Sequence, residues 1–245
     1  MQGLDSLAGR CKEYYAAGAR FAKWRSPIEI NMQLGRPTNL AIKANMQDLA
    51  RYALICQSEG LMPIVEPDVS LKGKHTLEQS VDVNIRVQSE LFKAMVDHGV
   101  YMAGSTLKSN MINPGRDCPT FYTVEEIAEA NMFVLEQSFP VAMKSANYLS
   151  GGQTLAQGAA RLSAINKAKA KGPWNLSFSW SAALQLPLLD LCKGGEMKLE
   201  EMSKLYIEEL VIASAAARGE WDWKAGDGDH KGTSVGTKRT FSSVK

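Results

Sequence analysis

The chain has 245 residues, of which 45% are apolar and 22% charged, and its formal net charge is +2 at pH 7. This composition is ordinary for a globular protein with a sizeable core, and the interspersed charges exclude a basic stripe of the kind that binds nucleic acid. No apolar run approaches 18 residues, and the first ten residues lack the basic and apolar regions of a signal peptide. We therefore expect no nucleic-acid partner, no membrane contact and a cytoplasmic location.

Residues that could bind a metal or form disulfides are widely scattered. The cysteines and histidines show no paired spacing and no metal-ligand spacing: Cys11, Cys56, Cys118, Cys192, His75, His98 and His230. We expect reduced, mostly buried thiols and neither a metal nor an organic cofactor.

Helical and strand-like segments alternate along the chain. Apolar residues recur with helical spacing in long segments that often end at glycine, and compact apolar runs separate these segments. In chain order we expect helix 4–18, strand 19–24, helix 41–58, strand 61–65, helix 76–98, strand 100–107, helix 123–138, strand 146–149, helix 154–169, strand 176–180, and helices 182–192 and 199–218. Thr123 and Glu126 form a capping-box pattern, and Pro187 is expected to kink or shorten its helix.

Polar residues stand where each predicted strand ends. Lys23, Glu66, Lys108 and Ser150 follow successive strands at intervals of 43, 42 and 42 residues. Regular strand–helix alternation with polar residues at the carboxyl ends of strands is typical of a parallel (β/α)8 TIM barrel, whose active sites lie at that end. A doubly wound α/β sheet would show the same alternation, but its glycine fingerprint is missing. The pattern favours the barrel.

Two lysines and a carboxylate would meet at the mouth of such a barrel. A lysine amine attacks a carbonyl only when it is unprotonated, and a neighbouring ammonium together with partial desolvation favours that form. A carboxylate beside it can move protons while the carbinolamine becomes a Schiff base. The alternative is that Lys23, Glu66 and Lys108 form ordinary salt bridges at strand ends.

The residues around these positions resemble class I fructose-bisphosphate aldolase. The resemblance runs from Gln2 to about Trp221, and the matching stretches are GARFAKWR (18–25), LARYALICQSEGLMPIVEPD (49–68), LKSNMINPG (107–115), LSGGQ (149–153), AINK (164–167), LSFSW (176–180) and AALQ (182–185). It implies a metal-independent lyase that cleaves fructose 1,6-bisphosphate reversibly, and a homotetramer.

The resemblance also implies a role for individual residues. Lys108 is similar to the Schiff-base lysine, Glu66 to the acid–base residue of the dehydration steps, and Lys23 to the lysine that assists it, while Asp68 stands where the family usually has a second glutamate. Phosphate binding is implied for Arg25 on one side and for the Ser150–Gly152 segment on the other. The full set of predicted binding residues is Arg25, Ser150, Gly151, Gly152, Ser179 and Ser181.

Several positions depart from the family pattern. Ala182 occupies the position of an arginine that grips a phosphate in the family, and Ser109 replaces the proline after the Schiff-base lysine. We expect no counterpart of the family's C-terminal tyrosine in this sequence, which ends Ser243-Val244-Lys245. These changes leave open a second reading, in which the chain is a non-catalytic aldolase relative that acts as a binding or structural subunit.

The resemblance covers only strands four to eight of the family barrel. We therefore expect residues 1–222 to form a partial barrel that lacks the first three strand–helix units, either as a fragment or as a shortened protein. A plastid-targeting segment would lie in the part that does not match. Residues 223–245 are rich in Gly, Asp, Lys, Thr and Ser, and we expect a flexible tail there.

Overall fold

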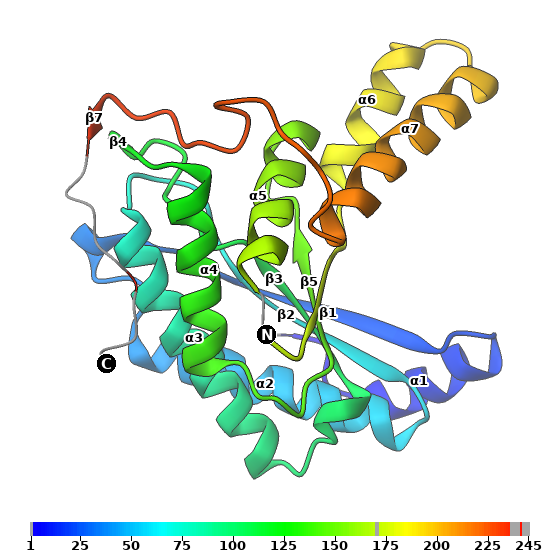
Figure 1. The fold of residues 1–245 in the computed structure, drawn as a ribbon. Coiled ribbons are helices and arrows are strands. Elements are labelled where there is room, and N and C mark those ends of the chain that lie inside the picture. The colour runs from blue at the N-terminus through cyan, green and yellow to red at the C-terminus, as the bar shows by residue number, and fades with distance from the viewer. Residues whose placement is uncertain (1, 170–171, 236–240, 242–245) are drawn as a thin grey trace.

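The computed structural model describes residues 2–169, 172–235 and 241. Its centre is a five-stranded parallel sheet in which neighbouring strands follow one another in the sequence, apart from the short β4 (Figure 1). The strands, in sheet order, are β1 (Phe21–Ile28), β2 (Met62–Val69), β3 (Thr106–Asn110), β5 (Ser145–Leu149) and β6 (Asn175–Phe178). This sequential parallel order, with helical crossovers, is that of a (β/α) barrel wall.

The helices lie close to the predicted bounds. They are α1 (Leu7–Ala16), α2 (Asn39–Ser58), α3 (Leu77–Asp97), α4 (Val124–Ser138), α5 (Leu155–Ala168), α6 (Ala182–Cys192) and α7 (Leu199–Ala217), with short 3-10 turns at Met32–Leu34 and Met102–Gly104. Capping boxes begin α3, α4 and α5, and in α4 the pair is the predicted Thr123 and Glu126. Because each box satisfies N–H groups that the helix leaves unpaired, the starts of these helices are fixed locally. Pro187 lies inside α6.

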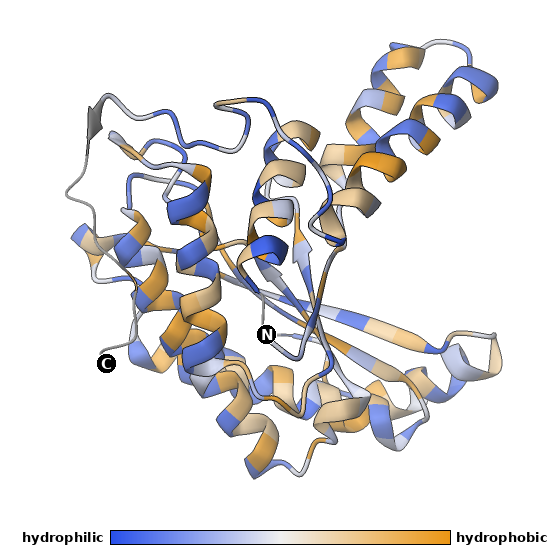
Figure 2. Cartoon of the chain, viewed as in Figure 1, coloured by the Kyte–Doolittle hydropathy of each residue, from blue (hydrophilic) through white to orange (hydrophobic). Residues whose placement is uncertain are grey.

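Helices α2 to α5 cover one face of the sheet (Figure 1), and hydrophobic residues occur in both the helices and the strands (Figure 2). Fully buried residues of this layer come from both helices and strands, among them Met46, Leu49, Val65, Leu91 and Leu107. Their burial explains why the helical periodicity was readable from the sequence. All four cysteines are free thiols, and Cys192 alone among them is not fully buried.

Three strands differ most from their predicted bounds, by four or more residues at one end. β1 continues to Ile28 and β2 to Val69, so Lys23 and Glu66 lie within strands and not after them. The strand predicted over 100–107 begins only at Thr106, and Lys108 is its central residue. The reason is the pairing between strands: Phe21 to Ile28 is matched residue by residue with Met62 to Val69, which keeps both strands extended past the polar positions.

The segment from Trp223 onward follows the surface of α4 and α5 as far as the structure describes it (Figure 1). The backbone N–H of Val124 donates to Asp229 Oδ1 at 2.8 Å, and the Arg161 guanidinium donates to the carbonyl of Gly228 at 2.7 Å. Short strands β4 (Thr120–Phe121) and β7 (Ser234–Val235) pair in parallel. Flexibility of this segment stays a prediction, and residues 236–240 and 242–245 of the predicted tail lie outside the described residues.

β1 and β6 form the two edges of the sheet, and helices α6 and α7 project as a pair from the β6 side (Figure 1). Apolar side chains lie exposed on this pair, including Leu186, Leu189, Ile207 and Val211. Within the described residues no helix is both long enough and apolar enough to cross a membrane.

Candidate active site

The polar side chains predicted to act together come from three neighbouring strands. Lys23 and Arg25 are two residues apart on β1, and Glu66 and Asp68 are two apart on β2, so each pair points to one face of the sheet. Lys108 belongs to β3, whose residue Leu107 is paired with Val65. The register therefore brings Lys108 beside Glu66 on the face opposite the helices.

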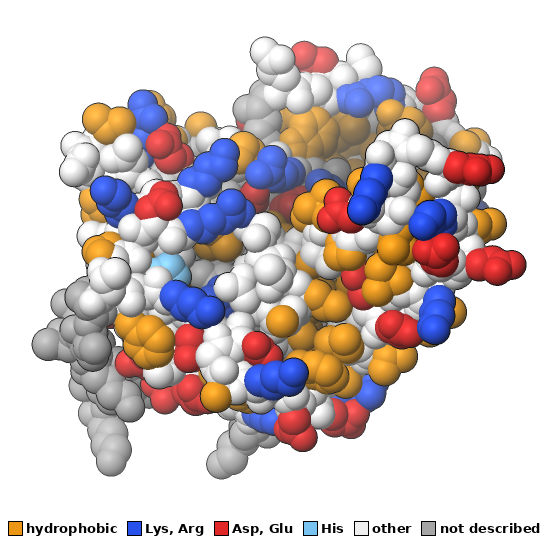
Figure 3. All heavy atoms as spheres, turned by 90° about the horizontal axis from the view of Figure 1, so that it is seen from above, with side chains coloured by type: hydrophobic (Ala, Val, Ile, Leu, Met, Phe, Trp, Pro, Cys, Tyr) orange, Lys and Arg blue, Asp and Glu red, His pale blue; other side chains and the backbone are white. Residues whose placement is uncertain are grey.

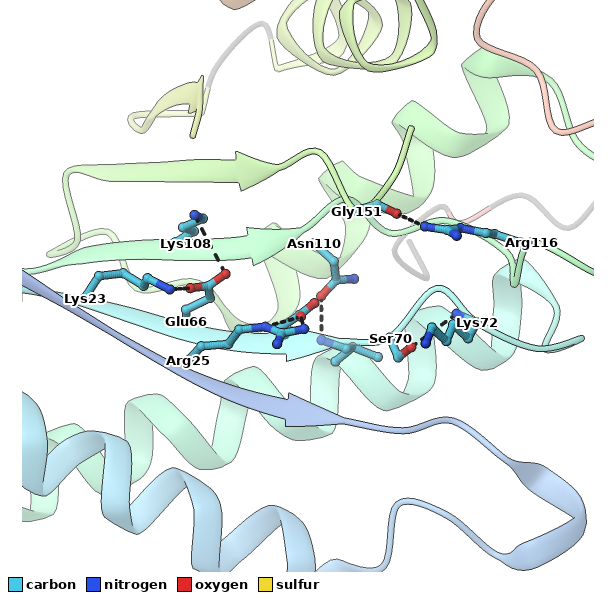
Figure 4. Close-up of polar contacts among 11 residues, drawn as sticks. Lys23, Arg25, Glu66, Ser70, Lys72, Lys108, Asn110, Arg116 and Gly151 are labelled. Carbon is cyan, nitrogen blue, oxygen red and sulfur yellow. Dashed lines mark hydrogen bonds and ion pairs between the residues drawn. The ribbon is translucent and has the colours of Figure 1, made fainter. Parts of the chain in front are cut away.

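Glu66 lies between the two lysines (Figure 4). Its Oε2 is 2.8 Å from Nζ of Lys23, and its Oε1 is 3.8 Å from Nζ of Lys108. The Glu66 side chain is 4% exposed and that of Lys108 is 14% exposed, whereas 40% of the Lys23 side chain faces solvent. A carboxylate held by two cations can exchange protons with a group that sits against Lys108.

A second ion pair lies one step further along the strands. Arg25 Nε donates to Asp68 Oδ2 at 2.7 Å, and its Nη2 lies 2.5 Å from the same oxygen. The Asn110 side chain accepts a hydrogen bond from the backbone N–H of Val69 at 3.0 Å. This bond ties the end of β2 to the end of β3, and so helps to fix Asp68 and Lys108 relative to each other.

A cavity of about 320 Å³ opens over these strand ends. Nine of the ten predicted site residues line it, and the tenth, Lys23, contacts the lining residue Glu66. The lining consists of Arg25, Glu66, Asp68, Ser70, Leu71, Lys72, Lys108, Arg116, Leu149, Ser150, Gly151, Gly152, Ser179, Ser181 and Ala182. Seen from above, lysine and arginine side chains gather beside a hollow on this face (Figure 3). The cavity thus combines an amine, carboxylates and several cations.

The loop after β5 brings backbone close to the cavity. Gly151 and Gly152 have φ values of +58° and +77°, a region that side chains other than glycine rarely adopt. A Cβ on Gly151 would lie 2.8 Å from Leu71 Cδ1, and one on Gly152 would overlap the Arg116 guanidinium. The positive φ values favour glycine at both places, and the lack of side chains there leaves the Ser150–Gly152 backbone accessible to a ligand.

Two cations at the cavity, Lys72 and Arg116, were not predicted from the sequence. Lys72 lies in the loop after β2, and Arg116 lies in the loop after β3, just beyond Gly115. Loops that follow the strands of a barrel form its active-site face, so their position after Asp68 and Lys108 was the signal that could have identified them. Among the described residues, no group of three or more His, Cys, Asp or Glu side chains is placed to hold a metal ion.

Comparison with known proteins identifies the family of the chain. The family model described as "Fructose-bisphosphate aldolase class-I" matches residues 1–241. The chain belongs to the class I fructose-bisphosphate aldolase family. It is 43% identical over 220 residues to fructose-bisphosphate aldolase of Dictyostelium discoideum, and 41% identical over 228 residues to fructose-bisphosphate aldolase 4, cytosolic, of Arabidopsis thaliana.

A solved structure is also similar. It is fructose-bisphosphate aldolase from Plasmodium falciparum in complex with TRAP and a small-molecule inhibitor, with a TM-score of 0.87 and 39% identity over 92% of this chain and 64% of that one. The matches to the Dictyostelium and Arabidopsis aldolases cover 90% and 92% of this chain, but only 61% and 58% of those proteins. The chain therefore spans about three-fifths of the length of these aldolases.

Proposed function

We propose that this chain carries the Schiff-base site of a fructose-bisphosphate aldolase, the lyase that reversibly cleaves fructose 1,6-bisphosphate into dihydroxyacetone phosphate and glyceraldehyde 3-phosphate in glycolysis and gluconeogenesis. The observation that carries the proposal is the contact of Glu66, which lines the cavity, with both Lys23 and Lys108. Family membership over residues 1–241 supports it.

In this proposal the reaction begins when the unprotonated amine of Lys108 attacks the C2 ketone of the substrate. The oxygen of the resulting carbinolamine takes up a proton from Glu66 and leaves as water, and the nitrogen loses its own protons until the imine remains. Lys23 keeps Glu66 in position through the 2.8 Å contact. Protonated, the imine accepts the electron pair of the C3–C4 bond as the C4 hydroxyl loses its proton, which releases glyceraldehyde 3-phosphate and leaves an enamine on Lys108.

The enamine then takes a proton at C3, and water hydrolyses the imine to release dihydroxyacetone phosphate and restore the amine. We assign phosphate binding to Arg25 on one side of the cavity and to Ser150, Gly151 and Gly152 on the other, where backbone N–H groups can face an anion. Ser179 and Ser181 add hydroxyl groups to the cavity wall. Asp68 orients Arg25 through their ion pair.

The activity test is cleavage of fructose 1,6-bisphosphate in the presence of a metal chelator, followed by trapping of the triose products. The proposal predicts cleavage that a chelator does not inhibit and that Lys108→Met abolishes. Cleavage that survives Lys108→Met, or that the chelator stops, would refute imine chemistry at this lysine.

One observation favours a second candidate function. Ala182 lines the cavity where the family resemblance implies an arginine, so one charged phosphate contact is missing. A non-catalytic relative that serves as a binding or structural subunit would tolerate this loss. Thermal unfolding separates the two candidates. A chain whose site binds sugar bisphosphate is stabilised by millimolar ligand through mass action, and a chain whose site no longer binds it is not.

We also propose a homotetramer in the cytoplasm with a sugar phosphate as its substrate. The family and the relatives named cytosolic support these proposals. Sedimentation of the purified chain tests the assembly, and fractionation of the source cells distinguishes the cytoplasm from a plastid.

A further inference from the structure

We propose that Lys72 and Arg116 form a phosphate clamp that takes the place of the arginine missing at position 182. The inference rests on the proposed function, since the ligand is the phosphate monoester of a sugar phosphate. Both residues line the cavity beside Gly151, Gly152 and Ala182.

The backbone holds the two cations in adjacent loops. The N–H of Arg116 donates to the carbonyl of Leu71 at 2.8 Å, and the N–H of Asp117 donates to the carbonyl of Gly73 at 3.0 Å. Lys72 lies between these two acceptors in the sequence, so the two hydrogen bonds fix its backbone next to that of Arg116. The cations are therefore placed as a pair by the loops after β2 and β3 (Figure 4).

These two cations also differ from the others at the cavity in their partners. Arg25 is paired with Asp68, and Lys108 faces Glu66. Within the part of the chain that the structure describes, Lys72 and Arg116 form no ion pair. Their charge is therefore available to an anion in the cavity.

Arg116 is oriented without using up its donors. One of its five N–H groups donates from Nη2 to the carbonyl of Gly151 at 2.5 Å. This bond holds the guanidinium over Gly152, where a Cβ would overlap it. The remaining donors can bind a phosphate in the bidentate manner typical of arginine, while Lys72 acts as a point charge.

The opposite wall favours the same ligand. Helix α6 begins at Ala182, and its N-cap residue Ser181 makes no side-chain capping hydrogen bond, although its carbonyl accepts from the backbone N–H of Leu184 at 3.1 Å. Because Ser181 and Ala182 line the cavity, the first turn of α6 and the positive end of its dipole lie at the cavity wall. The short Ala182 side chain leaves space there, and the cations that an anion needs come from the two loops instead.

Binding of D-glucitol 1,6-bisphosphate tests the clamp without requiring catalysis, because this hexitol has no carbonyl and cannot form an imine. Isothermal titration calorimetry would compare the unmodified chain with Lys72→Gln, Arg116→Gln and the double variant. A charge-assisted hydrogen bond at a partly exposed site corresponds to about a 10-fold change in affinity. We expect about 10-fold weaker binding for each single variant and about 100-fold for the double variant.

Lys74→Gln is the matched control. It removes the same charge from the same loop, but Lys74 lines a different cavity, beside Ile30 and Asn31. Any of three results would overturn the clamp. Lys74→Gln and Lys72→Gln could weaken hexitol binding equally, the double variant could bind the hexitol as tightly as the unmodified chain, or the unmodified chain could fail to bind it.

The proposed function can fail independently of the clamp. Loss of hexitol binding in the double variant, together with no imine on Lys108, would support the clamp and refute the aldolase activity. An imine on Lys108 of the unmodified chain, together with normal hexitol binding by the double variant, would support the aldolase activity and refute the clamp.

Discussion

Replacing Gly152 with alanine should disturb the phosphate site through Arg116. Gly152 has a φ of +77°, and an added Cβ would lie 2.9 Å from Cζ of Arg116 and closer still to its Nη2. The guanidinium must therefore move, and its bond to the carbonyl of Gly151 must lengthen or break.

The expected cost has two parts. Holding an alanine in the left-handed region costs roughly 1–2 kcal/mol of folding free energy. Loss of the Arg116 hydrogen bond adds at most about 1 kcal/mol, because this side chain is exposed and screened by solvent. Gly152→Ala should therefore lower the free energy of unfolding by about 2 kcal/mol and, by displacing Arg116, weaken hexitol bisphosphate binding by about 10-fold.

Gly99→Ala provides the matched control. Gly99 has a φ of +73° but no atom within 4 Å of an added Cβ, and it lies after α3, outside the cavity lining. Urea unfolding and calorimetry of both variants separate the cost of the backbone from the loss of Arg116. We expect similar destabilisation by the two variants and weaker ligand binding in Gly152→Ala alone.

A double-mutant cycle tests the reasoning further. If Gly152→Ala acts by moving Arg116, then Arg116→Gln should have less effect on binding in the Gly152→Ala background than in the unmodified chain. Hexitol binding by Gly152→Ala that equals that of Gly99→Ala would refute the reasoning.

Three further predictions concern acid stability, the central ion pair and the missing arginine. Burial lowers the pKa of His75 to about 4, so the unfolded chain binds more protons than the folded chain below pH 6.5. The free energy of unfolding should therefore fall by up to about 3 kcal/mol as the pH drops from 6.5 to 4. His75→Leu should flatten this pH dependence, as measured by urea unfolding at each pH. Lys23→Met leaves buried Glu66 with only the 3.8 Å contact to Lys108, and it should lower the free energy of unfolding by about 1–2 kcal/mol. Lys93→Met breaks a solvent-exposed pair with Asp97, and it should change the free energy of unfolding little. Equal effects of the two variants would contradict the importance of burial. Ala182→Arg should tighten hexitol bisphosphate binding by about 10-fold in calorimetry, and unchanged affinity would argue against a phosphate near the start of α6.

Helix positions could be predicted well because their signals are local. Thr123 and Glu126 satisfy each other's N–H groups within one turn, and the structure shows that capping box at the predicted place. Apolar spacing was equally informative for α2 and α3, since their buried stripes face a single sheet.

Strand ends were less predictable because partner strands determine them. The polar residues Lys23 and Glu66 were interpreted as ends, but pairing of β1 with β2 continues to Ile28 and Val69. A polar side chain can remain in a strand when its face of the sheet opens on a cavity, as it does for Glu66.

The same distinction applies to the site. Lys108 and Glu66 stand in sequence patterns that could be recognised, and the structure places them together. Lys72 and Arg116 were not predicted, because their positions after Asp68 and Lys108 indicate the active-site face but do not show that their two loops, about 44 residues apart, are joined by backbone hydrogen bonds from Arg116 and Asp117 to Leu71 and Gly73.

The central claim is imine formation on Lys108, and borohydride trapping tests it most directly. The purified chain is incubated with dihydroxyacetone phosphate or fructose 1,6-bisphosphate, reduced with borohydride, and analysed by intact and peptide mass spectrometry. The account predicts one substrate-sized adduct on the peptide that contains Lys108, and its loss in Lys108→Ala. A folded chain without an adduct, or with the adduct on another lysine, would contradict it.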